Sequence, residues 1–268
     1  MIVYLNYFKL RIITNFQYRA SAIAGILTQL FFGIFYIMLY LALYESNNGA
    51  ETPMDLNNLI TYMWLNQAFF SLIYPFFKDV ELLNMIKNGN LAYEFIRPQN
   101  FYIKYFIKIL SSRIVACFLR CLPILIIGMV LPYPYKISLP VSIHGFILFI
   151  ISLLFSSLLV TGLSLIIHII TIYLVDHRGV VNMYTVTADL FSGGFIPLPF
   201  LPNWLKKIAY VLPFRYLGDL PFRVYSGDIG IVEGRGLLLN SILWTFIFFI
   251  LGYLLTKVIY RKLVIQGG

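Results

Sequence analysis

The chain has 268 residues, of which 60% are hydrophobic and 12% are charged, whereas a soluble domain carries about 25% charged residues. Uncharged stretches of about 20 residues, long enough for a helix to cross about 30 Å of hydrocarbon, recur along it. Their hydrophobicity is continuous rather than alternating, which excludes a transmembrane β-barrel. We therefore expect an all-α integral membrane protein with a single transmembrane domain over residues 1–268.

Residues 1–21 are predicted to form an interfacial helix that leads into the first transmembrane span. Polar residues recur every few positions, and no short apolar core is followed by small residues, so the segment lacks the pattern of a cleavable signal peptide. Its aromatic and basic side chains suit the headgroup layer of a membrane. A frayed tail is the alternative.

Six apolar stretches predict six transmembrane helices, an even number that places both termini on one side of the membrane. We expect these spans at residues 22–44, 59–77, 114–131 and 141–175, from 179 to the broken stretch that begins near 191, and at 237–259. The fourth is long enough to tilt or to protrude from the bilayer.

The basic residues are distributed unevenly between the two sides. The side that carries the termini has thirteen Lys and Arg against four Asp and Glu, and the other side has six of each. Because an excess of Lys and Arg marks the cytoplasmic face, both termini are expected in the cytoplasm. The net charge of +9 then reflects the topology of a multi-pass cell-membrane protein and not a nucleic-acid partner.

Motifs for nucleotide or metal chemistry are missing from the sequence. It contains no G-x-x-x-x-G-K-[ST] loop, no G-x-G-x-x-G and no H-E-x-x-H. Cys117 and Cys121 lie one helical turn apart in the third span, where two thiols without another soft ligand indicate packing rather than a metal site. No catalytic constellation and no cofactor are expected on this chain.

The connection between the second and third spans, residues 78–105, has the caps of a short amphipathic helix. Asp79 is expected at the N-cap and Glu81 in the first turn, where negative charge is favourable. The pair Asn88-Gly89 predicts the C-terminal stop. Three apolar side chains share one face: Leu82, Met85 and Ile86. A helix of about ten residues under the membrane is one interpretation, and a solvated loop with ordinary caps is the other.

Two charged residues fall inside predicted spans. Arg120 is expected roughly 18 Å below the outer boundary and Asp189 roughly 15 Å from the inner one, at similar depth. Because an unpaired charge is costly there, we expect both to face the protein interior and to pair, within one chain or across a dimer interface. Otherwise Arg120 is solvated in a polar cavity and Asp189 helps to cap a broken helix.

Two segments together resemble the ABC-2-type transporter permease family. The stretch "IKNGNLAYEFIRP" is similar to that family's cytoplasmic coupling segment, which has a lysine-x-glycine stretch followed by an arginine-proline pair. The stretch "SGGFIPLPFLPNWLKKIAYVLPFRYLGDLPFRVYSGD" is similar to the family's late pattern of glycine, prolines and a proline-tryptophan-type helix. Asn203 between Pro202 and Trp204 is a mild departure. Length, span count and the leading helix also agree, so the resemblance covers nearly the whole chain.

The resemblance implies a membrane-spanning subunit of an ATP-driven exporter. Two permease chains, identical or paralogous, would pack together among membrane lipids, with one cytoplasmic ABC ATPase under each. ATP and magnesium would bind to the ATPase chains. A coupling helix would transmit the movement of the ATPases to the spans, and the residues implied in docking lie within 78–105: Asp79, Glu81, Lys87, Gly89, Glu94, Arg97 and Pro98.

The resemblance also implies a re-entrant segment of short helices at the outer face, residues 191–235. Glycines and prolines would break the fifth span there, since irregular backbone at membrane depth needs cover from protein or water. Asn203 would cap a new amphipathic helix that begins at Trp204. The segment acts as an outer gate or as a fixed lid, with these residues expected in it: Gly193, Gly194, Pro197, Trp204, Pro213 and Phe214.

The composition of the spans bears on the class of substrate. Spans that are rich in aromatic residues and poor in charge favour an amphiphilic or apolar cargo, such as a drug, an antimicrobial peptide or a lipid. Export of a lipid-linked polysaccharide stays open. Two interpretations lie outside transport: a polytopic membrane enzyme whose site assembles from Arg120, His168, Asp189 and the outer loop, and a structural membrane subunit without cargo.

Overall fold

The computed structural model describes residues 2–17, 19–46, 52–76, 78–88, 91–174 and 178–262. Within these residues the regular structure is entirely helical, which confirms the expected all-α class. Gly89, expected in the coupling segment, lies outside the described residues.

The helices follow one another with short connections. In chain order they are α1 (Ile2–Asn15), α2 (Arg19–Ser46), α3 (Leu56–Ile73), α4 (Val80–Lys87), α5 (Leu91–Ile96), α6 (Phe101–Val130), α7 (Ile143–Ile170), η1 (Thr171–Tyr173), α8 (Arg178–Ser192), η2 (Leu198–Phe200), α9 (Asn203–Val211), η3 (Pro213–Tyr216), α10 (Asp219–Ser226) and α11 (Ile231–Lys262).

Four helices in the described chain are long and apolar enough to cross a membrane, whereas the sequence predicted six spans. The four segments are Ala20–Ser46, Phe101–Val130, Ile143–Ile170 and Ile231–Ile259. The predicted second and fifth spans correspond to α3 and α8. The 15 residues of α8 extend roughly 22 Å, which is short of the hydrocarbon thickness. The 18 residues of α3 are mostly buried in the protein, where polar side chains are tolerated.

Several predicted boundaries were wrong. The third span was expected from residue 114, but α6 begins at Phe101 because the Asn100 side chain accepts the N–H of Ile103. Residues 78–105 therefore contain α4, α5 and the first turn of α6. The fourth span ends at Ile170 in a 3₁₀ turn, before residue 175, and α11 begins at Ile231, before residue 237.

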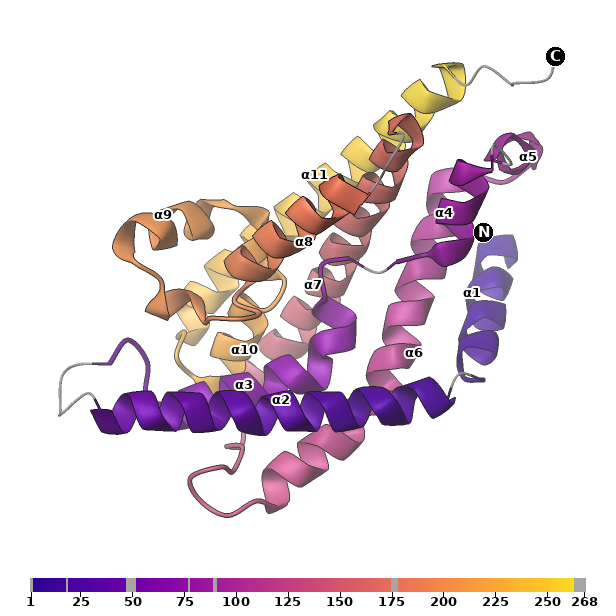
Figure 1. Ribbon diagram of the computed structural model, residues 1–268. Helices are drawn as coiled ribbons and strands as arrows, with labels where there is room; N and C mark the ends of the chain where they lie inside the picture. Colours follow the sequence, from indigo (N-terminus) through magenta and orange to yellow (C-terminus); the bar gives the residue numbers. More distant parts are fainter. Residues whose placement is uncertain are drawn as a thin grey trace.

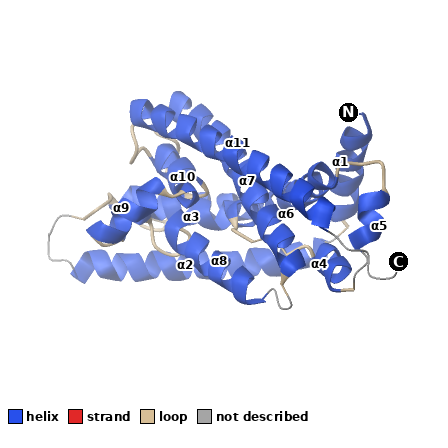
Figure 2. Cartoon of the chain, turned by 90° about the horizontal axis from the view of Figure 1, so that it is seen from above, coloured by secondary structure: helices blue, strands red, loops and turns tan. Residues whose placement is uncertain are grey.

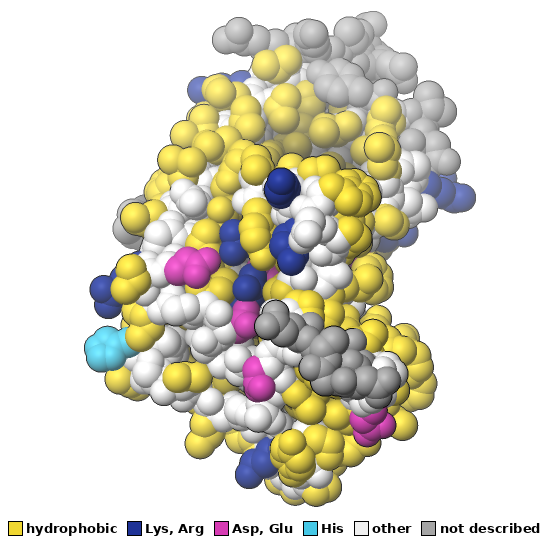
Figure 3. Space-filling view, turned by 90° about the vertical axis from the view of Figure 1, so that its left-hand side faces the viewer, with side chains coloured by type: hydrophobic (Ala, Val, Ile, Leu, Met, Phe, Trp, Pro, Cys, Tyr) yellow, Lys and Arg dark blue, Asp and Glu magenta, His cyan; other side chains and the backbone are white. Residues whose placement is uncertain are grey.

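The short helices gather at two opposite ends of the molecule. In Figures 1 and 2, α1, α4 and α5 lie at one end together with the last turns of α11, whereas α9 lies at the other end. The long helix α2 runs from the first end to the second. Figure 3 shows the end that carries α9, where hydrophobic side chains cover much of the surface and charged ones gather near its middle.

The core is built around α3, which packs against α2, α6 and α10. Trp64 is fully buried, and its ring lies between two glycines, at which an added Cβ would come within 3.2 Å (Gly33) and 3.1 Å (Gly128) of it. Its Nε1 donates a hydrogen bond of 2.7 Å to the carbonyl of Tyr135, in the connection after α6. The two glycines thus let α2 and α6 approach the bulky ring closely.

The chain breaks after α8 at the glycine pair that the sequence predicted, and α3 stabilises this break through hydrogen bonds. Gly193 has φ of 78°, and the N–H of Gly194 bonds the carbonyl of Asp189 at 3.1 Å, the long bond of a Schellman cap. The Tyr62 hydroxyl donates to the Gly193 carbonyl at 2.9 Å, and the Asn66 amide donates to the Gly194 carbonyl at 2.9 Å. A Cβ at position 193 would lie 2.2 Å from the Tyr62 hydroxyl.

We expect Gly193→Ala to destabilise the protein by about 1–3 kcal/mol, because the residue has left-handed backbone and no room for a side chain. The matched control is Gly179→Ala in α8, where nothing lies within 4 Å of an added Cβ. The measurement is the apparent melting temperature in detergent. Tyr62→Phe should partly rescue Gly193→Ala by removing the clashing oxygen, and equal melting temperatures for the two glycine variants would contradict the prediction.

Candidate functional site

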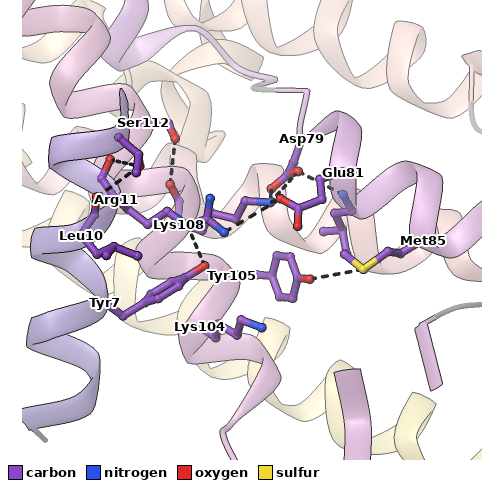
Figure 4. A network of polar contacts seen from close by, with 12 residues as sticks. Tyr7, Leu10, Arg11, Asp79, Glu81, Met85, Lys104, Tyr105, Lys108 and Ser112 are labelled. Carbon is purple, nitrogen blue, oxygen red and sulfur yellow. Dashed lines mark hydrogen bonds and ion pairs between the residues drawn. The ribbon is translucent and has the colours of Figure 1, made fainter. Parts of the chain in front are cut away.

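The predicted docking segment forms a helix whose first turn is held by a polar cluster, which we call the Asp79 network. It consists of Arg11, Asp79, Glu81, Lys108 and His168, from four different parts of the chain. Figure 4 shows all of these but His168 as they lie at the start of α4.

Asp79 is the N-cap of α4, as the sequence predicted. Its Oδ1 accepts the backbone N–H of Leu82 at 3.0 Å, which satisfies one of the free donors of the first turn. The predicted apolar face is also present: Leu82 is buried in a cluster that includes Tyr105 of α6, and Met85 and Ile86 pack against that cluster. The helix is therefore a packed element and not a solvated loop.

Lys108 of α6 reaches across to α4 and bonds both of its acidic residues. Its Nζ lies 2.9 Å and 2.8 Å from the two carboxylate oxygens of Asp79 and 2.7 Å from Oε2 of Glu81. Lys108 and Asp79 are buried, so these charge-assisted bonds are little screened by water. Arg11 of α1 lies 3.9 Å from the same Glu81 oxygen, which brings a second helix to the network.

The ring of His168 connects the network to α7. The backbone N–H of Asp79 donates to its Nε2 at 3.2 Å, so the proton is on Nδ1, which lies 2.7 Å from the carbonyl of Ser164. The ring is fully buried and stacks on Phe76 with centroids 4.7 Å apart. The sequence analysis named His168 beside Arg120 and Asp189 as a polar residue of a possible membrane enzyme, and the structure places it against the start of α4.

The hydrogen bond from Lys108 lowers the pKa of Glu81 below its usual value, and the charge of Arg11 acts in the same direction. Because this pKa is lower in the folded state, the contact contributes stability above the ordinary carboxyl pKa and loses it as the pH falls through the lowered value. The Glu81 side chain is 60% exposed, so the contribution is small.

The expected docking residues divide into buried and exposed ones. Asp79 and Glu94 are buried, and Glu94 is paired with Lys104 of α6 and with Arg97, so both hold the segment in place and do not face a partner. Four of the expected residues are exposed: Glu81, Lys87, Arg97 and Pro98.

The sequence analysis missed two exposed apolar residues on α5. Tyr93 is 69% exposed and Ile96 is 74% exposed, beside Arg97. No sequence signal pointed to them, because α5 has only six residues and its buried side chains include Leu91 and the charged Glu94.

The predicted pair between Arg120 and Asp189 does not form within one chain. Arg120 donates to the Ser71 hydroxyl at 3.1 Å and packs against α2, where a Cβ at Gly25 would lie 2.5 Å from its guanidinium carbon. It borders a polar cavity of about 440 Å³ that extends to Asp79 and Lys108. Within one chain, Arg120 thus borders a cavity, as the alternative had it, and the backbone carbonyl of Asp189 takes part in the cap at the end of α8. A pair across a dimer interface stays a prediction.

At the opposite end, α9 carries the predicted amphipathic face, but its predicted cap was wrong. Pro202 occupies the N-cap, and Asn203 is already the first helical residue, so its side chain does not cap the helix. Trp204, Ile208 and Val211 are 67%, 45% and 74% exposed, and the buried Ala209 faces the protein. Of the other expected gate residues, Pro197 and Pro213 are buried and Phe214 is half-buried.

The comparisons with known proteins identify the family to which this arrangement belongs. The sequence model of the family described as ABC-2 family transporter protein matches residues 34–267. The chain belongs to the ABC-2 transporter family. It is therefore the membrane component of a transporter, a transport subunit and not an ATPase, which removes support from the membrane-enzyme interpretation. No curated protein matches the sequence.

Some basic residues of this ABC-2 subunit that the sequence analysis counted on the cytoplasmic side are buried. Arg113 is fully buried on α6 and donates to carbonyls at the end of α3, those of Leu72 at 3.2 Å and Tyr74 at 2.6 Å. A cation at this place satisfies free carbonyls and complements the helix dipole. The sequence contained no sign that Arg113 is buried and bonded in this way, because the hydrogen bonds join residues about forty positions apart.

A second buried charge group of the subunit lies at the end that carries α9. Asp219 is fully buried between Arg215 at 3.6 Å and Arg223 at 3.3 Å, and Arg223 also bonds Asp228. The sequence held a signal for these ion pairs, because Arg215 and Arg223 each lie four residues from Asp219, a spacing that brings side chains together on a helix. Both cysteines are buried thiols, and the described part of the chain has no group of three His, Cys, Asp or Glu side chains placed to hold a metal ion.

We expect Lys108→Met to destabilise the subunit by about 3–5 kcal/mol, because it leaves the buried Asp79 carboxylate without its cation. Lys87→Met, at the exposed end of α4, is the matched control and should have little effect. The double variant Asp79→Asn with Lys108→Met should recover part of the loss. The measurement is the melting temperature in detergent, and a Lys108→Met variant as stable as Lys87→Met would contradict the role of the pair.

Proposed function

We propose that this chain is the permease subunit of an ATP-driven exporter that moves an amphiphilic or apolar substrate, such as a drug, an antimicrobial peptide or a lipid, out of the cytoplasm or the inner leaflet. Two permease chains pack together in the cell membrane with both termini in the cytoplasm. One ABC ATPase docks under each chain and carries the ATP and magnesium.

The observation that carries the proposal is the Asp79 network. It bonds the first turn of α4 to Lys108 in α6 and to His168 in α7, both of which are candidate membrane spans. A force on α4 therefore reaches two long helices through short polar contacts in a buried setting. This is the mechanical property that a coupling helix needs, since coupling requires an element whose movement both sites share.

The exposed side of α4 and α5 supports docking of a protein partner. Its exposed side chains include charges of both signs, Glu81, Lys87 and Arg97, and the apolar Tyr93 and Ile96. A mixture of aromatic, aliphatic and arginine side chains is typical of protein interfaces. The ATPase is proposed to bind here, while the buried Asp79 and Glu94 hold the surface in shape.

At the other end, α9 is proposed to act as the outer gate. Its exposed Trp204, Ile208 and Val211 form an apolar face that suits the membrane interface. The segment follows the break at Gly193, whose carbonyl accepts a hydrogen bond from Tyr62 of α3. A fixed lid is the alternative, in which this face does not move during transport.

Purification from the native membrane in mild detergent, with mass spectrometry of the proteins that remain bound, tests the proposal. We expect a P-loop ATPase at about one copy per permease chain. Its reproducible absence from a folded preparation would point to a stand-alone membrane protein. The same preparation shows whether the second permease chain is identical or a paralogue.

We expect Glu81→Gln to uncouple hydrolysis from transport in proteoliposomes that contain the ATPase. The Glu81 side chain is 60% exposed and is joined to Arg11 and Lys108, so we propose that its charge contributes to both docking and transmission. Transport per ATP hydrolysed should fall roughly tenfold or more, within the usual range of coupling free energies, with an unchanged melting temperature.

Two comparison variants accompany this measurement. A substitution at Gly89 is expected to uncouple in the same way, and Glu45→Gln, an exposed carboxylate at the end of α2, is expected to behave as the wild type. Normal transport by both the Glu81 and the Gly89 variants would refute the docking role of this segment.

A further inference from the structure

A cavity of about 280 Å³ lies between the middle of α2, the second half of α3 and the end of α8. It is separate from the cavity next to Arg120 and from the surface of α4 and α5. Gln29 is roughly 14 Å along the span from Ala20, which places the cavity near mid-depth in the candidate span of α2.

Aromatic rings form most of the apolar wall of this cavity. Phe32 and Tyr36 of α2 stack with centroids 6.1 Å apart, and Phe70 and Tyr74 of α3 lie 4.9 Å apart. Phe195, just after the break in α8, completes the wall. Phe32, Phe70 and Phe195 are partly exposed, so the cavity opens on the apolar surface of the protein.

Asp189 is the charged side chain among the residues that line the cavity. It is 8% exposed, and within the described chain its carboxylate has no ion pair and no hydrogen bond. A Cβ at Gly194 would lie 3.6 Å from Asp189 Oδ1, at ordinary van der Waals distance, so this glycine lies directly beside the carboxylate. A carboxylate in such surroundings lacks the compensation that buried charges normally have.

Gln29 adds a second polar group without a partner. The residue is 5% exposed, lines the cavity, and neither its amide nitrogen nor its amide oxygen has a hydrogen-bond partner among the described residues. An unpaired buried amide is costly, and native structures rarely keep one without a reason. The cavity is thus lined by two polar side chains that have no partner among the described residues.

We propose that this cavity is a substrate subsite for an organic cation with an apolar body, such as a lipophilic ammonium or phosphonium ion. The positive charge compensates Asp189, and the ring faces of the wall attract cations while they bury the apolar part. An anion is repelled by Asp189, and a neutral guest leaves the carboxylate unpaired. The assignment rests on the proposed export function and names its substrate class.

The test is equilibrium binding of radiolabelled tetraphenylphosphonium to the purified full-length chain in nanodiscs, corrected with empty nanodiscs. Tetraphenylborate, a lipophilic anion of similar size, is measured in the same way. We expect saturable binding of the cation and no saturable binding of the anion. Failure to bind the cation, or equal binding of both ions, would overturn the proposal.

Asp189→Asn is expected to weaken cation binding roughly tenfold or more, because it removes the compensating charge at nearly constant shape. Glu45→Gln removes a carboxylate from the exposed end of the same helix that lines the cavity and should bind as the wild type. Unchanged binding by Asp189→Asn would overturn the proposal. If that variant fails to fold, Phe70→Leu provides the test, since loss of one ring should weaken binding roughly threefold or more.

This binding measurement needs no ATPase. A failure of the proposed subsite can therefore be told apart from a failure of the proposed export function. Cation binding without ATP-driven movement in proteoliposomes would contradict the exporter and leave the subsite in place. ATP-driven export of a neutral or anionic cargo, without cation binding, would overturn the subsite and leave the exporter in place.

Discussion

The structure depends most on one buried carboxylate, that of Asp79, at the start of α4. It accepts the N–H of Leu82, pairs with Lys108 of α6, and its own backbone N–H bonds His168 of α7. A buried charge of this kind tolerates little displacement, because each partner that moves away leaves a desolvated group unpaired. The short helix is therefore fixed in position relative to two long helices, although it has only eight residues of its own.

The central helix α3 connects the two ends of the molecule. Toward its C-terminal end, Arg113 of α6 bonds the carbonyls of Leu72 and Tyr74, close to the Asp79 network. Farther toward its N-terminus, Tyr62 and Asn66 hold the backbone of the break after α8. Because α3 is buried along most of its length, a displacement of α6 near α4 would be transmitted by α3 as a rigid element. The displacement would then reach the segment that carries α9.

The polar residues inside this apolar protein serve different purposes, and burial separates them. Arg113 and Asp219 are fully buried and bonded to backbone or to opposite charges, so they stabilise local structure. Glu81 and Arg97 are exposed at the α4 end, where a partner can reach them. Asp189 belongs to neither class, because it is nearly buried and yet unpaired. A buried charged group without a partner indicates a functional site, whereas an exposed charge is solvated and needs no partner.

The sequence by itself determined the membrane class, the all-helical fold, the cap at Asp79, the apolar faces of α4 and α9, and the break at Gly193. These depend on composition, on helical period and on neighbours within a few positions, which are all local properties. Family membership was likewise within reach, because the motifs and their order are linear features.

Only the tertiary structure decided which side chains meet. Asp79 and His168 are 89 positions apart, and Arg113 and the end of α3 about forty, so no periodicity links them. Within one chain, Arg120 and Asp189 do not pair although their depths match, because depth along a helix says nothing of the direction in which a side chain points. Burial is decided in the same way: α3, which the sequence predicted as a membrane span, is mostly buried against its neighbours and is not among the four candidate spans.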